Sequence, residues 1–594
     1  MPQHMQGSAY EEGRWSLDDL FPATSGPEIE QAFADVQAAA DAIEARQSAL
    51  VPEIEEAAFV EILEWIVKLT YVTDKLDGFA VLSFFADTED QEALALRGRV
   101  DTLQADARNR ALRFELWWKA LDEENARRLL KAAGDNAYYL RTLRRFAPYT
   151  LSEVEERIVN VKNVNGAAGL AKLYTMITSN LNFDFDSDGE SIELTRSELM
   201  DYARDESPER REAAFRALLA VYETRSAELS QIYKCIVNDW HAEKVALRGF
   251  SSPIAFRDLD NDIPEVVVET LLETCRDNTA LYQRYFRLKA RWLGLPKLRQ
   301  FDLLAPLEDT VTEIPFSDGV RLVLDTFRAF SPKLAALAER VLADGHVDSE
   351  IRPGKRGGGL SWDALPGLTP WILINYGGRV HDVTTLAHEL GHAVHAMMAA
   401  EHSALTFSPP LPLAETASSF AQILLLEAML EGADSELRRT LLAKYIEDSY
   451  AQILRQAFRV LFEQRAHRMI VDGATSDEIC AAYLETLREP FGDSVEVDEI
   501  FRHGWVGISH FYTQPFYDYA YAFGLLLVLA LYRRYRAEGD AFVPSYLEIL
   551  SYGGSKAPLE ILDQAGFDIR QRAFWQGGFD VLSGMVGKLE GLVE

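Results

Sequence analysis

A histidine pair with a glutamate beside its first member is the part of this 594-residue sequence best suited to chemistry. His388, Glu389 and His392 lie in the run Leu-Ala-His-Glu-Leu-Gly-His-Ala-Val. On an α-helix, residues four apart point the same way, so both imidazoles can bind one metal ion. Zinc prefers nitrogen ligands of this kind, and a neighbouring carboxylate can act as general base toward water bound to the ion. The motif predicts one zinc ion and hydrolysis of an amide bond, with Glu389 as the base.

A catalytic zinc ion needs a third protein ligand and an open coordination position. The longer zinc-endopeptidase motif is excluded, because the positions that it assigns to Gly and His hold other residues. After the Pro-rich run 408–412, an apolar-periodic segment begins near Leu413, and a helical hairpin would return Glu415 to the histidine pair. A glutamate at a helix start is also favoured by the helix dipole, so spacing alone leaves the alternatives Glu401 and Glu427 open.

A second cluster, rich in aromatic residues, spans residues 503–524. It contains His503 and His510 together with the tyrosines Tyr512, Tyr517, Tyr519 and Tyr521. Attack on a peptide bond places negative charge on the carbonyl oxygen, which a phenol or an imidazole N–H can stabilise. Ordinary aromatic packing accounts for most of these side chains, and we expect one or two of them to face the zinc ion.

Helical patterns dominate the elements that must position these residues. The apolar stripe within residues 25–46 is one example, and similar stripes recur through most of the chain. Strand patterns occur in a hairpin formed by 182–185 and 191–195, and in the run 371–376. The glycine-rich loop 354–359 lacks the ending of a phosphate-binding loop and is expected to be a flexible surface turn. The predicted fold class is mainly α, with a small β-sheet near the zinc motif.

Composition excludes several other classes of protein. Lys and Arg number 60 and Asp and Glu number 93, which gives a net charge of −33 and argues against binding to nucleic acid or to an anionic membrane. The longest apolar run, 522–532, is too short to span a bilayer. Only three cysteines occur, far apart, and the first 15 residues lack the apolar core of a signal peptide. We therefore expect a cytoplasmic protein.

Taken together, these motifs resemble the oligoendopeptidase F branch of the thimet-oligopeptidase-like zinc metallopeptidases. The resemblance extends over nearly the whole chain and includes the segments 15–21, 241–249, 301–306, 354–358, 372–376, 388–392, 414–418 and 510–521.

The resemblance implies a fold, a substrate class and roles for individual residues. It implies a two-lobed helical shell with the zinc ion deep in a channel that admits short unstructured oligopeptides. We expect an N-terminal helical lobe over 1–200 and the catalytic region over 201–594. By likeness, His388, His392 and Glu415 bind zinc and Glu389 is the base.

The same resemblance implies that His510, with a tyrosine after it, stabilises the transition state. Spacing favours Tyr519, with Tyr512, Tyr517 and Tyr521 as alternatives. The resemblance also implies that an edge strand around 374–376 pairs with the substrate backbone.

The zinc motif leaves two other functions open. A carboxypeptidase or dipeptidyl carboxypeptidase would use the same metal site, with a cation to hold the carboxyl terminus of the substrate. A non-catalytic peptide-binding protein would hold zinc for structure alone. Glu389 argues against that second alternative, as does the lack of a cysteine near the motif, because structural zinc sites are closed by four ligands, often cysteines.

Overall fold

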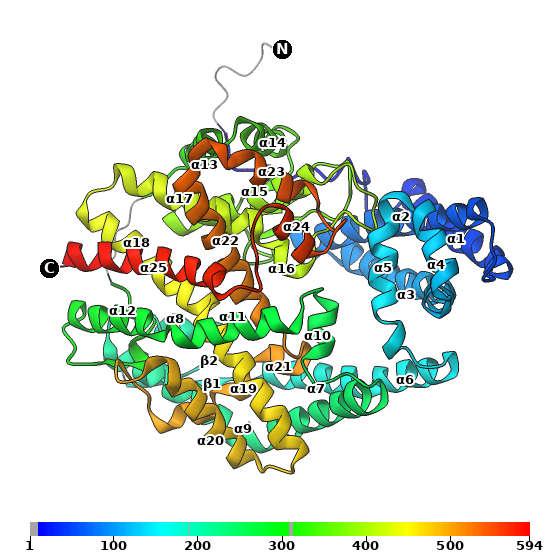
Figure 1. The fold of residues 1–594 in the computed structure, drawn as a ribbon. Coiled ribbons are helices and arrows are strands. Elements are labelled where there is room, and N and C mark those ends of the chain that lie inside the picture. The colour runs from blue at the N-terminus through cyan, green and yellow to red at the C-terminus, as the bar shows by residue number, and fades with distance from the viewer. Residues whose placement is uncertain (1–9, 188, 308–312, 594) are drawn as a thin grey trace. The chain divides into compact units, whose positions relative to one another are not determined.

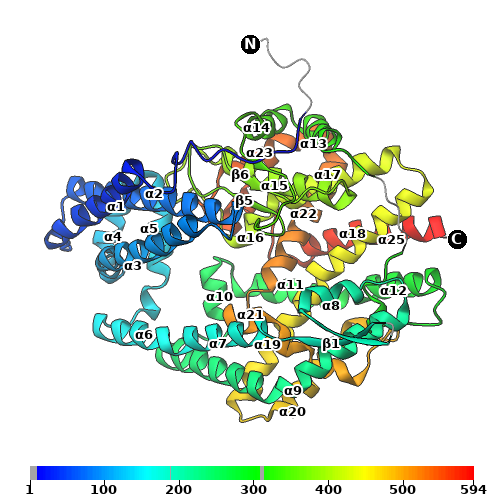
Figure 2. The same ribbon diagram turned by 180° about the vertical axis from the view of Figure 1, so that it is seen from behind.

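The computed structural model describes residues 10–187, 189–307 and 313–593, and most of them lie in helices (Figures 1 and 2). The predicted fold class, mainly α, is confirmed. Two compact units make up the chain. Unit 1 comprises Met1–Pro148, Val311–Gly432 and Leu531–Asp568, and unit 2 comprises Tyr149–Thr310, Ala433–Ala530 and Ile569–Glu594. The units therefore do not follow the predicted division at residue 200, because the chain passes repeatedly from one unit to the other.

Unit 1 contains the N-terminal helices and every element around the histidine motif. Its helices are α1 (Pro27–Ala45), α2 (Glu56–Ala86), α3 (Gln91–Ala120), α4 (Glu123–Ala132), α5 (Ala137–Arg145), α13 (Phe316–Phe330), α14 (Pro332–Ala343), α15 (Val380–Met398), α16 (Leu411–Ala414), α17 (Thr416–Gly432), α23 (Val543–Ser551) and α24 (Pro558–Gln564). Helix α1 matches the predicted stripe: it begins at Pro27, which suits a first helical turn, and buries Ile29, Val36 and Ile43. Helices α1, α2 and α3 pack together around Phe59 and Trp118 (Figure 1).

A three-stranded sheet packs against α15, and it is the small sheet that was predicted near the zinc motif. Its strands are β4 (Val347–Asp348), β5 (Leu360–Trp362) and β6 (Trp371–Leu373), in the order β4-β6-β5. The strand predicted over 371–376 is thus shorter, and the prediction that it is an edge strand is wrong. Strand β6 pairs with β4 on one side and β5 on the other, and the next amides, of Ile374 and Tyr376, donate to the carbonyls of Asp348 and Ser349.

The glycine-rich loop before β5 is anchored, contrary to the predicted flexible turn. The Lys355 side chain is completely buried and its Nζ lies 2.8 Å from Oδ1 of Asp348. The same Nζ donates to the carbonyls of Asp348, Glu350 and Ile374. A buried ammonium group is stable only when it is paired and hydrogen-bonded, so these contacts hold the loop against the sheet. The loop therefore delivers Gly359 and β5 to a defined place beside α15.

Unit 2 is built around long helices. Its helices are α6 (Glu153–Asn165), α7 (Ala167–Ser179), α8 (Arg196–Tyr202), α9 (Pro208–Trp240), α10 (Ala255–Asp260), α11 (Glu265–Asp277), α12 (Thr279–Trp292), α18 (Ser435–Gln452), α19 (Leu454–Val471), α20 (Ser476–Arg488), α21 (Ser509–Thr513) and α25 (Arg572–Val593). Helix α22 (Tyr519–Glu538) begins in unit 2 and ends in unit 1. The predicted hairpin is confirmed as β1 (Phe183–Ser187) and β2 (Glu190–Leu194), and a short parallel pair joins β3 (Leu298–Arg299) to β7 (Val495–Glu496).

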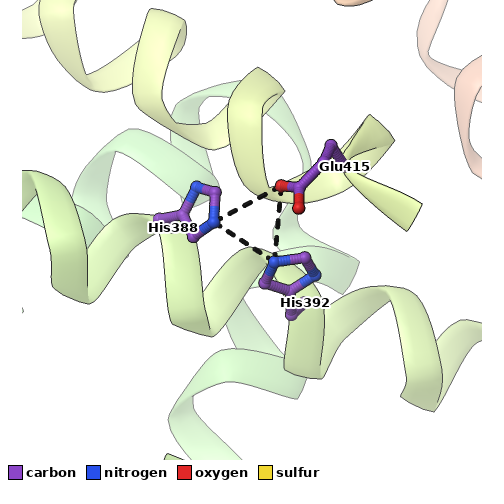
Figure 3. A group of neighbouring side chains, drawn as sticks. All are labelled: His388, His392 and Glu415. Carbon is purple, nitrogen blue, oxygen red and sulfur yellow. Dashed lines mark hydrogen bonds and ion pairs between the residues drawn. The ribbon is translucent and has the colours of Figure 1, made fainter. Parts of the chain in front are cut away.

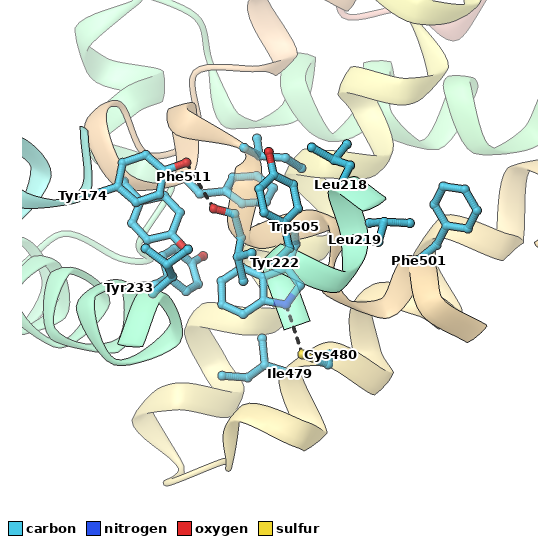
Figure 4. Packing of buried hydrophobic residues seen from close by; sticks show 14 of the residues in the cluster. Tyr174, Leu218, Leu219, Tyr222, Tyr233, Ile479, Cys480, Phe501, Trp505 and Phe511 are labelled. Carbon is cyan, nitrogen blue, oxygen red and sulfur yellow. Dashed lines mark hydrogen bonds between the residues drawn. The ribbon is translucent and has the colours of Figure 1, made fainter. Parts of the chain in front are cut away.

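An aromatic core holds the first part of the second sequence cluster, up to Tyr512, within unit 2 (Figure 4). Trp505 is completely buried there and its Nε1 donates to Sγ of Cys480 at 3.3 Å. Tyr512 stacks on Tyr174 with ring centroids 3.7 Å apart. Packing against α9 and α20 therefore fixes the segment that leads to His510.

Among the residues that the structure describes, one segment, Leu411–Gly432, is long and apolar enough by composition to cross a membrane. An apolar window of 18 residues within it is 61% buried inside the protein, and the segment includes Glu415 between α16 and α17. Core helices of soluble proteins show the same composition, so its apolar character is explained by packing within unit 1.

Candidate metal centre and active site

Three side chains of unit 1 converge on one point (Figure 3). The Nε2 atoms of His388 and His392 lie 3.2 Å apart. Oε2 of Glu415 lies 3.4 Å from the first of these nitrogens and 3.5 Å from the second. A tetrahedral zinc ion with bonds of about 2.0–2.2 Å holds its ligand atoms about 3.3–3.6 Å apart. The predicted donor set therefore fits one zinc ion, and within the described residues no other His, Cys, Asp and Glu group of this kind occurs.

Close packing of two helices positions the third ligand. Both histidines lie on α15, whereas Glu415 lies just before α17. Gly391 permits the approach, because a β-carbon there would lie 2.6 Å from Cα of Ser418. Oγ of Ser418 also donates to Oε2 of Glu415 at 2.7 Å, which orients the carboxylate.

The two alternative third ligands lie elsewhere. Glu401 is exposed after the end of α15. Glu427 forms an ion pair with Arg536. Of the carboxylates considered from the sequence, only Glu415 reaches the histidine pair.

The protonation states of His392 and Glu415 suit metal binding. Burial lowers the pKa of His392 to about 4, despite the opposing effect of Glu415, so the imidazole is neutral at pH 7. Burial raises the pKa of Glu415, but the two histidines and the Ser418 hydroxyl outweigh it and bring this pKa below its ordinary value. Neutral imidazoles and an ionised carboxylate are the forms that bind a metal ion.

Glu389 lies beside this centre and is nearly buried, at 6% exposure. Burial, followed by the charges of Glu415 and Asp363, raises its pKa to about 8. A carboxyl group with a pKa near neutrality can both accept and return a proton. The loop before β5 confines this side chain, because a β-carbon at Gly359 would lie 2.4 Å from its Oε1.

Asp363 is a site residue that the sequence analysis missed. It follows β5, and its carboxyl group interacts electrostatically with Glu389 and Glu415. Burial raises the pKa of Asp363 to about 7. A lone Asp after a strand carries no motif, so only the fold reveals its position.

His510 lies in unit 2 and is held by a carboxylate. Its Nδ1 is hydrogen-bonded to Oδ1 of Asp518, a residue with 1% side-chain exposure. The half-buried rings of Tyr517 and Tyr521 surround the imidazole, with centroids 5.1 and 5.9 Å from it. Asp518 carried no predicted role, although a His with an acid eight residues later is a visible signal in the sequence.

The tyrosine favoured from spacing, Tyr519, is buried in this structure. Tyr519 has no exposed surface, and its hydroxyl accepts a hydrogen bond from Nδ2 of Asn261 at 2.8 Å. Tyr512 is also buried, stacked on Tyr174. The burial of Tyr519 does not favour the predicted role, and Tyr517 and Tyr521 are the tyrosines that flank His510 with part of their surface exposed.

Comparison with known proteins points the same way as the site. The model of peptidase family M3 matches residues 201–581, and the model described as oligopeptidase F matches residues 117–183. Oligopeptidase PepF of Bacillus subtilis is 27% identical over 435 residues, covering 71% of this chain and 64% of that protein. An oligoendopeptidase F homolog of Lactococcus lactis is 26% identical over 409 residues, 68% of each chain.

Solved structures share the fold. A putative peptidase from Chlamydophila abortus has a TM-score of 0.87 at 23% identity, with 98% of both chains covered. Oligoendopeptidase-F from Enterococcus faecium has a TM-score of 0.73 at 21% identity, covering 95% of this chain and 99% of that one. The family model spans more than half of the sequence and includes the histidine motif and Glu415. The chain therefore belongs to peptidase family M3 and is a peptidase, as the resemblance of its motifs to oligoendopeptidase F predicted.

Proposed function

We propose that this peptidase is a zinc-dependent endopeptidase that hydrolyses short unstructured oligopeptides. One observation carries the proposal: the ligand atoms of His388, His392 and Glu415 stand 3.2–3.5 Å apart, with Glu389 beside them. The names of the relatives, oligoendopeptidase F and oligopeptidase, support the substrate class.

The three ligand residues would hold the ion, and Ser418 would keep the Glu415 carboxylate turned toward it. Zinc bound there supplies Lewis acidity, which polarises a peptide carbonyl and acidifies water. Glu389 accepts the proton of the attacking water and returns it to the leaving amine. Its confinement between α15 and Gly359 limits the positions that this carboxylate can take.

Strand β5 is the element best placed to align a peptide. It has a strand partner on one side only within the described part of the chain, whereas β6 is paired on both sides. Gly359, which directly precedes β5, is adjacent to Glu389. A substrate that adds as a strand to the free edge of β5 would run past the base in an extended conformation. We therefore propose that the substrate backbone pairs with β5 and not with residues 374–376.

His510, with Tyr517 or Tyr521, would stabilise the negative charge that develops on the substrate carbonyl oxygen. Asp518 supports this role, because its bond to Nδ1 of His510 fixes the ring and leaves Nε2 for the substrate. These residues belong to unit 2, so their contribution is tested by mutation.

Exopeptidase action with the same metal site is the competing function. A panel of quenched-fluorescence peptides, blocked at both ends and read by mass spectrometry, separates the two. We expect internal cleavage of blocked peptides. Cleavage that requires a free carboxyl terminus would replace the endopeptidase proposal with the exopeptidase one.

The decisive variant is Glu389→Gln, which keeps the size of the side chain and removes the base. We expect peptide hydrolysis to fall by about 10²–10⁴-fold while bound zinc is retained. Glu401→Gln is the matched control, because Glu401 is exposed after the same helix. Activity of E389Q equal to that of E401Q would reject the mechanism, and unchanged activity of the wild type after chelation would reject zinc dependence.

A reducing compartment, such as the cytoplasm, suits this chain. Its cysteines, Cys235, Cys275 and Cys480, are all free, and two of them are buried. Free buried thiols are typical of proteins that fold where disulfides do not form. We therefore retain the cytoplasm as the proposed place of action.

A further inference from the structure

Unit 2 contains a cavity of about 300 Å³ that the proposed chemistry does not use. Residues of α12, α18, α19 and α20 line it. Its walls are largely apolar and include the rings of Phe286, Phe458, Phe462 and Phe491. Pockets of this kind bind small ligands with a few polar groups that fix orientation.

The acidic groups that line this cavity are already paired. Glu447 accepts hydrogen bonds from Lys289 and Tyr285. Asp448 accepts a hydrogen bond from Lys444 at 2.7 Å. Neither carboxylate is left to neutralise a further cation.

Two arginines of α19, Arg455 and Arg459, line the same cavity and have N–H groups that no carboxylate in the described part of the chain accepts from. Arg455 lines the cavity but is an exposed residue, and it has no hydrogen bond or ion pair with any of the described residues. Arg459 donates to Oε1 of Gln456 at 2.8 Å, and its nearest carboxylate oxygen, on Asp518, is 3.7 Å away.

The side-chain amide of Gln300 is a third polar group that can hydrogen-bond a ligand in the cavity. The side-chain oxygen of Gln300, which also lines the cavity, is buried without a hydrogen-bond partner. The amide oxygen and nitrogen of a glutamine exchange places by a flip of the side chain, so the same group can donate to an anion.

We infer that this cavity binds a small organic carboxylate with an apolar or aromatic body. The carboxylate would pair with Arg455 and Arg459, because a guanidinium fork matches carboxylate geometry. The body would pack against the phenylalanine rings. An anion there also relieves the repulsion between the guanidinium group of Arg455, which has no ion pair with the described residues, and that of Arg459, whose ion pair with Asp518 spans 3.7 Å.

The site is connected to His510 through two contacts. Arg459 lies 3.7 Å from Oδ2 of Asp518, and Oδ1 of the same carboxylate bonds to His510. Oδ2 of Asp518 is buried and has no hydrogen bond, so the Arg459 charge is its main compensation. A bound carboxylate that pairs with Arg459 weakens the stabilisation that Arg459 gives to the Asp518 carboxylate. We therefore expect the bound carboxylate to change the pH profile of hydrolysis. This consequence rests on the proposed function, whereas the binding site does not.

Calorimetry on the full chain tests the site with 3-phenylpropionate as the probe. The neutral 3-phenylpropanamide has the same apolar body, and sodium chloride supplies an anion without one. We expect the carboxylate to bind at least about tenfold more tightly than the amide, and chloride at the same concentration not to displace it. Equal binding of the amide, displacement by chloride, or no binding of the carboxylate would overturn the proposal.

Two variants of α19 localise the binding. Arg455→Gln removes a guanidinium that has no hydrogen bond or ion pair with the described residues, and we expect a loss of affinity of at least about tenfold. Arg465→Gln is the matched control, because Arg465 lies on the same helix and pairs with Glu485 outside the cavity. Equal affinity of R455Q and R465Q would overturn the site.

A kinetic arm separates this proposal from the proposed function. In the wild type, saturating 3-phenylpropionate should displace the pH profile of kcat/KM, and in R455Q it should not. An unaltered profile with normal calorimetric binding would overturn the connection to His510. A chain that binds the probe but hydrolyses no peptide would reject the proposed function and leave the binding site standing.

Discussion

Gly391 and Ser418 approach so closely that a β-carbon on the glycine would lie 2.6 Å from Cα of the serine and 2.9 Å from its amide nitrogen. Gly391 is part of the histidine motif on α15, and Ser418 lies on α17, one turn after Glu415. This contact brings a carboxylate from a distant part of the sequence to the two imidazoles. The glycine of the motif is therefore a packing requirement of the metal centre.

Gly391→Ala should push α15 and α17 apart, because the obstructing atoms are backbone atoms that cannot rotate away. We expect a loss of about 1–3 kcal/mol in the free energy of unfolding, together with weaker zinc binding. Gly98→Ala on α3 is the control, since nothing lies within 4 Å of its position. That variant should gain up to about 1 kcal/mol from helix propensity. Thermal unfolding and zinc titration measure both effects, and matching behaviour of G391A and G98A would contradict the packing argument.

Gly359→Ala should disturb the base and leave the fold intact. Its β-carbon would meet Oε1 of Glu389 at 2.4 Å, and the end of a glutamate side chain can move. Because a displacement of about 1 Å costs roughly 10²-fold in rate, we expect kcat to fall by about that factor at unchanged zinc content. Gly357→Ala, in the same loop with nothing within 4 Å, should keep its activity. A fully active G359A would place Glu389 outside the chemistry.

The tyrosines around His510 should separate by function. Replacing an oxyanion-stabilising donor costs about 10²–10³-fold in kcat, and we expect this for Tyr517→Phe or Tyr521→Phe. Tyr519→Phe removes the acceptor of the buried Asn261 amide and should cost about 1–3 kcal/mol of stability with kcat nearly unchanged. Steady-state kinetics and thermal unfolding of the three variants test the assignment. A large loss of kcat in Y519F alone would restore the original prediction.

Glu463 should make the protein less stable as the pH rises. Burial raises the pKa of Glu463 well above its ordinary value, and its Oε2 accepts from the amide of Phe516 at 2.9 Å. In the unfolded chain the group ionises near pH 4.3, so above that pH the unfolded state releases a proton that the native state keeps. This contribution lowers stability by up to about 1.4 kcal/mol per pH unit until the native pKa is reached.

Glu463→Gln removes this contribution and preserves an acceptor for Phe516. We expect the melting temperature of E463Q to rise relative to that of the wild type between pH 5 and pH 8. Measurements in one buffer series at constant salt are sufficient. Parallel curves for the two proteins would show that Glu463 is already ionised in the native state.

Features that depend on local spacing could be predicted from the sequence. The helical period places His388 and His392 on one face of α15, and the alternation around residues 183–194 forms the predicted hairpin. The chemistry of the histidine pair with Glu389 followed from residue type alone. Such features need no knowledge of distant neighbours, because the backbone geometry of a single element determines them.

Tertiary structure alone decided which distant groups meet and which are buried. It selected Glu415 over Glu401 and Glu427, placed Asp363 beside Glu389, and enclosed Tyr519. It also put β6 between two strands, although its apolar run looks the same at an edge. These outcomes depend on close packing between segments far apart in the chain, such as the contact of Gly391 with Ser418, and spacing along the sequence does not record them.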